Sequence, residues 1–171
     1  MNFTELGLNA RMVSRLEGQG LAKPTPIQQK AIPHALQGRD VLGIAQTGTG
    51  KTAAFGIPLV VALSKHQEKA APRSARGLIL APTRELANQI VESLRSLSAD
   101  LRINLVVGGK SINAQSQKLS RGSDILVATP GRLIDLMDRR AVDLRQTRFL
   151  VLDEADQMLD IGFIHALRQI A

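Results

Sequence analysis

Residues 41–52 read VLGIAQTGTGKT, and this stretch decides the predicted fold. An apolar run, 41–45, leads into a glycine-containing loop that ends in Lys51 and Thr52. Glycines let backbone N–H groups turn toward phosphate oxygens, and a helix that follows adds the positive end of its dipole. Lysine can neutralise the β- and γ-phosphates, and a threonine hydroxyl can bind Mg²⁺. The stretch therefore predicts a nucleoside triphosphate site between a strand and a helix.

The whole loop is predicted to bind the nucleotide. The strict phosphate-loop pattern, GxxxxGK[ST], has glycine at the position where this chain has alanine. The strand–loop–helix setting is nevertheless the one that the pattern requires. The predicted nucleotide-binding residues of the loop are Ala45, Gln46, Thr47, Gly48, Thr49, Gly50, Lys51 and Thr52.

Four further apolar runs follow the loop, and helix-like segments lie between them. The runs are rich in Val, Ile and Leu without polar alternation, which is typical of strands buried on both faces of a parallel sheet. The clearest helix is 83–97, with Thr83 as its N-cap. This alternation predicts an α/β fold, a parallel sheet flanked by helices, with ligands at the carboxyl ends of the strands. The runs are 78–81, 103–107, 125–128 and 149–152.

Residues 1–40 carry no strand signal and are predicted to form a separate helical region. Its two helices are expected at 9–18 and 26–36, with glycine and proline between them. Residues 41–171 are predicted to form the nucleotide-binding core. Pro58 predicts a kink or an early end in the helix that follows the phosphate loop.

The charge balance points to a polyanionic partner, because 22 Lys and Arg stand against 15 Asp and Glu, a net charge of +7. Part of this charge lies on 64–76, which is predicted to be a solvated loop. The chain has no Cys, which excludes disulfides and thiolate zinc sites, and it has no Trp or Tyr. A nucleic acid would therefore be held by its backbone and not stacked on rings. No signal peptide or membrane span is found in the sequence, so we expect a cytoplasmic protein without membrane contacts.

An acidic run supplies what a phosphate site needs for metal binding and hydrolysis. Residues 149–156 read FLVLDEAD, so the last predicted strand ends in carboxylates. Asp153 is placed to hold Mg²⁺ together with Thr52. Glu154 can orient or deprotonate the attacking water. A helix N-terminus that favours acidic residues would explain one carboxylate but not the run.

The DEAD sequence at 153–156, together with the phosphate loop, resembles the bacterial-type DEAD-box ATP-dependent RNA helicases. The other blocks that look like motifs of this family stand in the family's order. They are PTPIQ at 24–28 (the Q motif), PTREL at 82–86 (Ia), GG at 108–109, TPGR at 129–132 (Ib) and MLDIGF at 158–163. The resemblance implies the first RecA-like domain of a P-loop NTPase, preceded by a helical Q-motif extension.

The resemblance implies ATP as the nucleotide and Mg²⁺ as the metal. The Gln28 amide has one donor face and one acceptor face, which match N7 and N6 of adenine, whereas guanine presents an acceptor in place of the N6 donor. Phe3, Leu21 and Lys23 are assigned to the same base site. Many family members have an aromatic residue at position 21, so Leu21 predicts modest ATP affinity. The implied catalytic residues are Lys51, Asp153, Glu154 and Asp156, the last in a coupling role.

RNA contacts are implied for three motifs that each follow a predicted strand. Guanidinium and hydroxyl donors suit phosphates, and glycines allow close approach, so we expect backbone recognition with little sequence specificity. The implied RNA-binding residues are Thr83, Arg84, Gly108, Gly109, Thr129, Gly131 and Arg132.

The chain ends at Ala171, before the family's Ser-Ala-Thr motif and its second RecA-like domain. We therefore expect a C-terminally truncated, monomeric fragment of an enzyme that unwinds short RNA duplexes at the expense of ATP. The missing domain would supply arginine fingers, worth about 10³–10⁵ in rate, so the fragment alone is expected to be inactive or nearly so. The alternatives are an ATP-regulated RNA clamp and a DNA-directed RecA-like motor.

Overall fold

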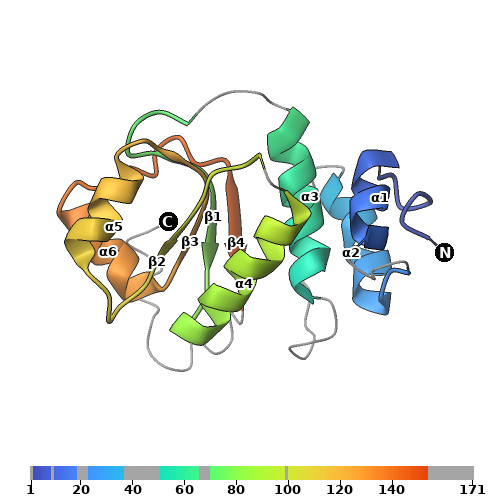
Figure 1. Cartoon of the computed structure of the whole chain (residues 1–171), viewed down its shortest axis with the longest axis horizontal. Coiled ribbons are helices and arrows are strands. Elements are labelled where there is room, and N and C mark those ends of the chain that lie inside the picture. The colour runs from blue at the N-terminus through green and yellow to red at the C-terminus, as the bar shows by residue number, and fades with distance from the viewer. Residues whose placement is uncertain are drawn as a thin grey trace. The chain divides into compact units, whose positions relative to one another are not determined.

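The computed structural model describes residues 2–8, 10–18, 23–36, 51–65, 70–98 and 100–153 (Figure 1). The chain divides into two compact units. One comprises Met1–His66 with Ser93–Ala99, and the other comprises Gln67–Glu92 with Asp100–Ala171. The predicted division at residue 40 remains a prediction. None of the described helices is both long enough and apolar enough to cross a membrane.

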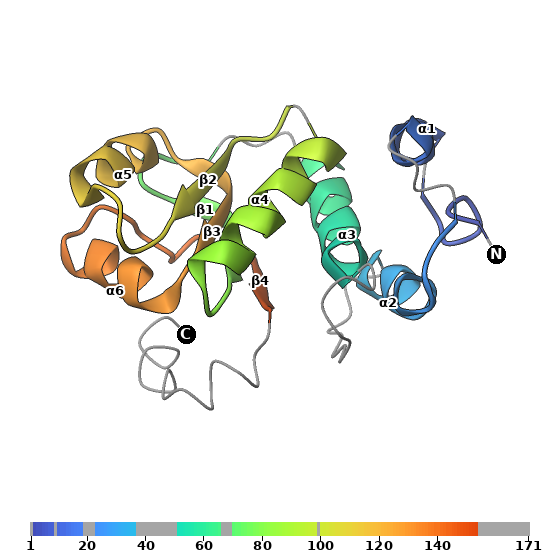
Figure 2. The same cartoon turned by 60° about the horizontal axis from the view of Figure 1, so that its bottom comes forward.

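The first unit is helical. It contains α1 (Ala10–Gly18), α2 (Pro26–Leu36) and α3 (Lys51–Lys65), which confirms the two helices predicted before residue 40. Helix α1 is amphipathic, so Met12 and Leu16 are buried on one face. Helix α2 packs against α3, as both views show (Figure 2). Ile32 and Ile57 are fully buried there.

Helix α3 continues through Pro58 to Lys65, so the predicted early end is wrong. A proline inside a helix costs about 3 kcal/mol, because one hydrogen bond is lost and the ring crowds the preceding turn. Its neighbours Ile57, Leu59 and Val60 are all buried. Burying each such side chain contributes about 1.5–3 kcal/mol, which together outweighs the proline penalty.

The second unit contains a four-stranded parallel sheet in the order β2-β3-β1-β4. Its strands are β1 (Ala75–Leu80), β2 (Ile103–Val106), β3 (Ser123–Ala128) and β4 (Phe149–Leu152). All four confirm predicted strands, while the strand predicted at 41–45 lies outside the described residues. Helices α5 (Ile112–Leu119) and α6 (Pro130–Asp138) lie on one side of the sheet, and α4 (Arg84–Leu97) lies on the other (Figures 1 and 2).

The basic loop predicted at 64–76 is shorter than expected at both ends, because α3 reaches Lys65 and β1 begins at Ala75. Arg76 can lie within β1 because its guanidinium pairs with Asp124 of β3 at 3.1 Å. A charged side chain in a strand is tolerated when a cross-strand carboxylate compensates it. From composition alone, the segment that contains Arg76 was predicted to be a loop.

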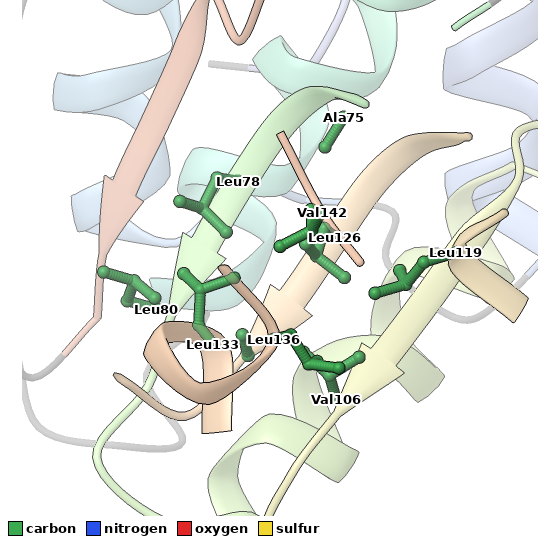
Figure 3. Close-up of a cluster of buried hydrophobic side chains, with 10 residues drawn as sticks. Ala75, Leu78, Leu80, Val106, Leu119, Leu126, Leu133, Leu136 and Val142 are labelled. Carbon is green, nitrogen blue, oxygen red and sulfur yellow. The ribbon is translucent and has the colours of Figure 1, made fainter. Parts of the chain in front are cut away.

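Buried apolar side chains pack between the sheet and α6 and hold the strands in position. Leu78 and Leu80 of β1 and Leu126 of β3 are buried, together with Leu133 and Leu136 of α6. Figure 3 shows the two α6 leucines beside the strands that carry the others. Ile79, which points to the opposite face of β1, is also fully buried. Strands β1 and β3 are therefore buried on both faces, as their apolar runs predicted, whereas Leu150 and Leu152 of β4 are exposed.

Candidate functional site

A buried carboxylate marks the carboxyl end of the sheet. Asp153 follows β4 directly and is only 3% exposed. Its backbone N–H donates to the carbonyl of Leu80 at 2.9 Å, which holds the end of β4 beside the end of β1. A carboxylate oxygen is the ligand type that Mg²⁺ prefers, so Asp153 fits the predicted metal ligand. Among the described residues no three acidic or histidine side chains gather into a metal cluster.

Lys51 is the first residue of α3, so it starts the helix whose N-terminus is predicted to face the phosphates. The side chains of Lys51 and Thr52 are not among those that the structure describes. The other predicted site residues that lie outside the described residues are Leu21, Ala45, Gln46, Thr47, Gly48, Thr49, Gly50, Glu154 and Asp156.

Gln28 is buried, with 2% exposure, and belongs to a reciprocal cap at the start of α2. The backbone N–H of Thr25 donates to Oε1 of Gln28 at 3.0 Å, and that of Gln28 donates to Oγ1 of Thr25 at 3.4 Å. This capping box fixes which end of the amide is the acceptor. Phe3 is buried and Lys23 is exposed.

Arg84 and Gly109 are brought together from different strand ends. Gly109 has φ +80°, a conformation that favours glycine, and a Cβ at this position would collide with the Arg84 guanidinium. Arg84 begins α4 after β1, whereas Gly109 follows β2. This close approach places the positive charge of Arg84 next to the loop that carries Gly108 and Gly109, which we call the glycine loop. A Cβ at Gly108 or at Gly131 would meet no atom within 4 Å.

Arg132 connects the TPGR motif with the segment that follows Gly109. Its Nη1 donates to the carbonyl of Lys110 at 2.9 Å and to Oε1 of Gln115 at 3.0 Å. Arg132 lies in the first turn of α6, after β3, so these bonds tie the β3 end to the loop after β2. The three predicted RNA motifs therefore form one continuous surface at the carboxyl edge of the sheet.

Two helix N-termini open onto this surface. The hydroxyl of Thr83 accepts a hydrogen bond from the backbone N–H of Leu86 at 3.2 Å, which confirms Thr83 as the cap of α4. Thr129 is the N-cap of α6, but its side chain makes no capping hydrogen bond. Its hydroxyl can thus be directed to a ligand. Helix N-termini and arginines favour the same ligand, an anion such as phosphate.

Gln115 is a supporting residue that sequence reasoning missed. It is 6% exposed, and its Nε2 donates to the carbonyl of Val107 at 3.0 Å while its Oε1 accepts from Arg132. It therefore holds both the glycine loop and the arginine. The detectable signal was a polar residue on the apolar stripe of α5, in line with Ile112 and Leu119.

Comparisons with known proteins identify sequence relatives of this chain. A sequence model described as DEAD/DEAH box helicase matches residues 25–171. The DEAD-box ATP-dependent RNA helicases CshA of Bacillus cereus (strain ATCC 10987 / NRS 248) and Bacillus anthracis are each 45% identical over 98% of this chain. The chain spans 31% of the length of these relatives.

Two solved structures share the fold. The RNA-helicase Prp28 from Chaetomium thermophilum, bound to ADP, matches with a TM-score of 0.90 and 44% identity, over 99% of this chain and 42% of that one. The yeast DEAD-box splicing factor Prp28 matches with a TM-score of 0.86 and 40% identity over the same shares.

Proposed function

Because the chain belongs to the DEAD/DEAH box helicase family, we propose that it is the ATP-binding first domain of an RNA helicase. The complete enzyme couples ATP hydrolysis to local unwinding of RNA duplexes. The fold is the RecA-like fold that the sequence predicted, as the likeness to both Prp28 structures shows. The observation that carries the proposal is the joined surface of Arg84, Gly109 and Arg132 on the sheet edge that also holds Asp153.

ATP is bound, in this proposal, by two regions with separate tasks. Residues 1–40 recognise adenine through Gln28, with Phe3, Leu21 and Lys23 around the base. Residues 41–171 hold the phosphates through the loop 45–50, the lysine that starts α3 and the helix N-terminus. The capping box supports this assignment, since it presents the Gln28 amide in a single orientation.

Hydrolysis is assigned to carboxylates at the end of β4. Thr52 and Asp153 would hold Mg²⁺, and the bound metal would offset the negative charge of the phosphate oxygens. Glu154 orients the attacking water and accepts its proton. Asp156 couples the nucleotide site to the remaining helicase motifs. We expect the chain by itself to be inactive or nearly so in ATP hydrolysis, because the second RecA-like domain would supply the arginine fingers. We expect it to be a cytoplasmic monomer.

RNA is recognised by its backbone at the joined surface. The guanidiniums of Arg84 and Arg132, the hydroxyl of Thr129 and the helix N-termini are all donors for phosphate oxygens. None of these groups reads a base edge, so binding is nearly independent of sequence. Thr83, Gly108 and Gly131 complete the surface.

The full-length protein provides the direct test. We expect its ATP hydrolysis to be stimulated by RNA and a short RNA duplex to be separated only while ATP is present. An RNA clamp would bind RNA in the presence of ATP without sustained turnover or strand release. A DNA-directed motor would be stimulated by DNA and not by RNA. Either result would replace the helicase assignment.

Gln28→Ala is expected to lower ATP affinity about 5- to 100-fold and to leave GTP affinity within about twofold, because only adenine offers the matched donor and acceptor. Gln28→Glu keeps the acceptor for the Thr25 N–H but has no amide donor for adenine N7, so it should also lose the preference for ATP. Because position 28 is buried, the melting temperature of each variant is measured beside the nucleotide affinities. Titrations with fluorescent ATP and GTP analogues measure the ratio, and an unchanged ratio in both variants would contradict adenine recognition.

A further inference from the structure

Arginines precede every strand of the described sheet. Arg102 lies one residue before β2, Arg121 two before β3, Arg73 two before β1 and Arg148 one before β4. These positions are far apart in the sequence. In the sheet order β2-β3-β1-β4 they lie next to one another at the amino ends of the strands, which we call this edge of the sheet. Strands lie about 4.8 Å apart, so the four positions span about 14 Å. Arg140 joins them, since the Arg73 guanidinium donates to its carbonyl at 3.5 Å. We call these five residues the arginine row.

The arginine row is exposed, and the carboxylate of Asp143 interacts with one of its members, Arg73, through its charge. All five side chains are exposed. Within the described part of the chain, none of the five forms a salt bridge. The ion pairs at this edge use other arginines: Arg76 with Asp124, Arg139 with Asp135 and Arg145 with Asp143.

Asp143, a carboxylate close to the arginine row, is bound by Arg145. Hydrogen bonds from the Arg145 side chain and backbone lower the pKa of Asp143 to about 2, and the charge of Arg73 contributes. Asp143 therefore stays ionised and bound to Arg145 at neutral pH. The segments that form this edge (70–76, 100–103, 117–124 and 135–148) carry nine cationic and five acidic side chains, a net charge of +4.

Two members of the row occupy backbone positions at which arginine is unfavourable. Arg73 has φ 61° and Arg140 has φ 57°. Arg140 follows the last turn of α6, where the N–H groups of Arg140 and Ala141 donate to Met137 and Leu136, the bonding pattern that ends helices at a glycine. Glycine would relieve the strain at both positions. Strained residues of this kind cluster at functional sites, so these two positions support a role for their side chains.

We propose that the arginine row is a second RNA-binding surface, which holds the phosphates of a strand that continues beyond the site at the carboxyl ends of the strands. The row lies at the opposite ends of these strands, about 20 Å away along β1. The proposal extends the proposed helicase function and rests on it for the identity of the RNA. All five residues are arginine, whose planar guanidinium binds phosphate in a bidentate manner.

A backbone phosphate strand fits this surface better than a protein partner does. Protein interfaces have a desolvated apolar centre. Among the described residues, the exposed large hydrophobic side chains are Leu150 and Leu152, and both lie within β4 and not in the segments before the strands. The row offers only charge and hydrogen-bond donors, which is the composition of a phosphate-contacting surface.

The test compares two RNA lengths on double variants of equal charge change. The probes are single-stranded RNAs of about 6 and about 30 nucleotides, which fill one site or reach beyond it. Arg73→Gly/Arg140→Gly and Arg102→Gln/Arg121→Gln alter the row. The control, Lys30→Gln/Arg95→Gln, removes two exposed cations elsewhere. Affinity is measured by fluorescence anisotropy as a function of salt, and folding by the melting temperature.

Both row variants are expected to bind the long RNA about 5- to 10-fold more weakly and to lower the salt slope by about 1.4, the value for two lost phosphate contacts. The short RNA should bind unchanged, and the control should change both affinities less than about twofold. The glycine variant should melt at the same or a higher temperature, which separates lost binding from lost folding. Equal losses in the control, or unchanged long-RNA affinity in both row variants, would overturn the proposal. Unchanged affinity would also be the result if the row binds an acidic protein segment.

A further variant separates the two RNA surfaces. Arg84→Gln/Arg132→Gln should weaken the short RNA as well as the long one. If it leaves the short RNA unaffected, the proposed site at the carboxyl edge is wrong, while the row variants still decide the arginine row by the long RNA alone.

Discussion

Glu154→Gln should abolish RNA-stimulated ATP hydrolysis by the full-length protein while ATP still binds. Glutamine has nearly the same size as glutamate, so the site keeps its shape, but an amide cannot accept the proton of the attacking water. Loss of a general base typically lowers the rate about 10²–10⁴-fold. The neighbouring Asp153 is buried at the end of β4, a position suited to a metal ligand, which leaves the water to Glu154. Phosphate release measures turnover, and a fluorescent ATP analogue measures binding.

Glu92→Gln is the matched control for this substitution, because Glu92 is an exposed glutamate on α4 and carries no proposed role. It should retain full activity. Appreciable hydrolysis by Glu154→Gln would remove Glu154 from catalysis. Loss of ATP binding in that variant would instead assign it to the nucleotide site.

Gly109→Ala is expected to weaken RNA binding about tenfold or more. The added Cβ would displace the Arg84 guanidinium from its proposed position against an RNA phosphate. The loss of that charge-assisted hydrogen bond would reduce the binding free energy by about 1.5–3 kcal/mol. Alanine at φ +80° adds strain of about 1–2 kcal/mol, which should lower the melting temperature by several degrees. RNA affinity by anisotropy and thermal unfolding measure the two effects.

Gly108→Ala separates a structural from a binding role in the same loop, because a Cβ at Gly108 would meet no atom within 4 Å apart from its chain neighbours. Its melting temperature should stay unchanged. Weaker RNA binding by this variant would mean that RNA itself approaches Gly108. If Gly109→Ala binds RNA as well as the unchanged chain, the position of Arg84 does not determine RNA affinity.

Most secondary structure was predictable because it depends on neighbouring residues. The leucine spacing of α4 and its Thr83 cap, and the apolar runs of β2 and β4, are local patterns. The structure departs from prediction where distant partners act. Arg76 joins β1 because Asp124 compensates its charge, and α3 passes Pro58 because its neighbours are buried.

The candidate site was predictable in part for the same reason. Arg84, Gly109 and Arg132 lie in short motifs that can be recognised one at a time. Gln115 has no motif, and its role appears only in its bonds to Val107 and Arg132. Such a residue is found by burial and partners, which no local pattern contains.

By itself, the sequence identified the chemical groups of the candidate site: a predicted phosphate loop, an acidic run after the last strand and three motifs predicted to bind RNA, each written in a few consecutive residues. The tertiary structure alone decided which of these groups meet. The strands of this parallel sheet do not follow the order of the chain, so the order β2-β3-β1-β4 brings Arg84 over Gly109 at the carboxyl ends of the strands. The same strand order aligns the arginine row at the amino ends of the strands.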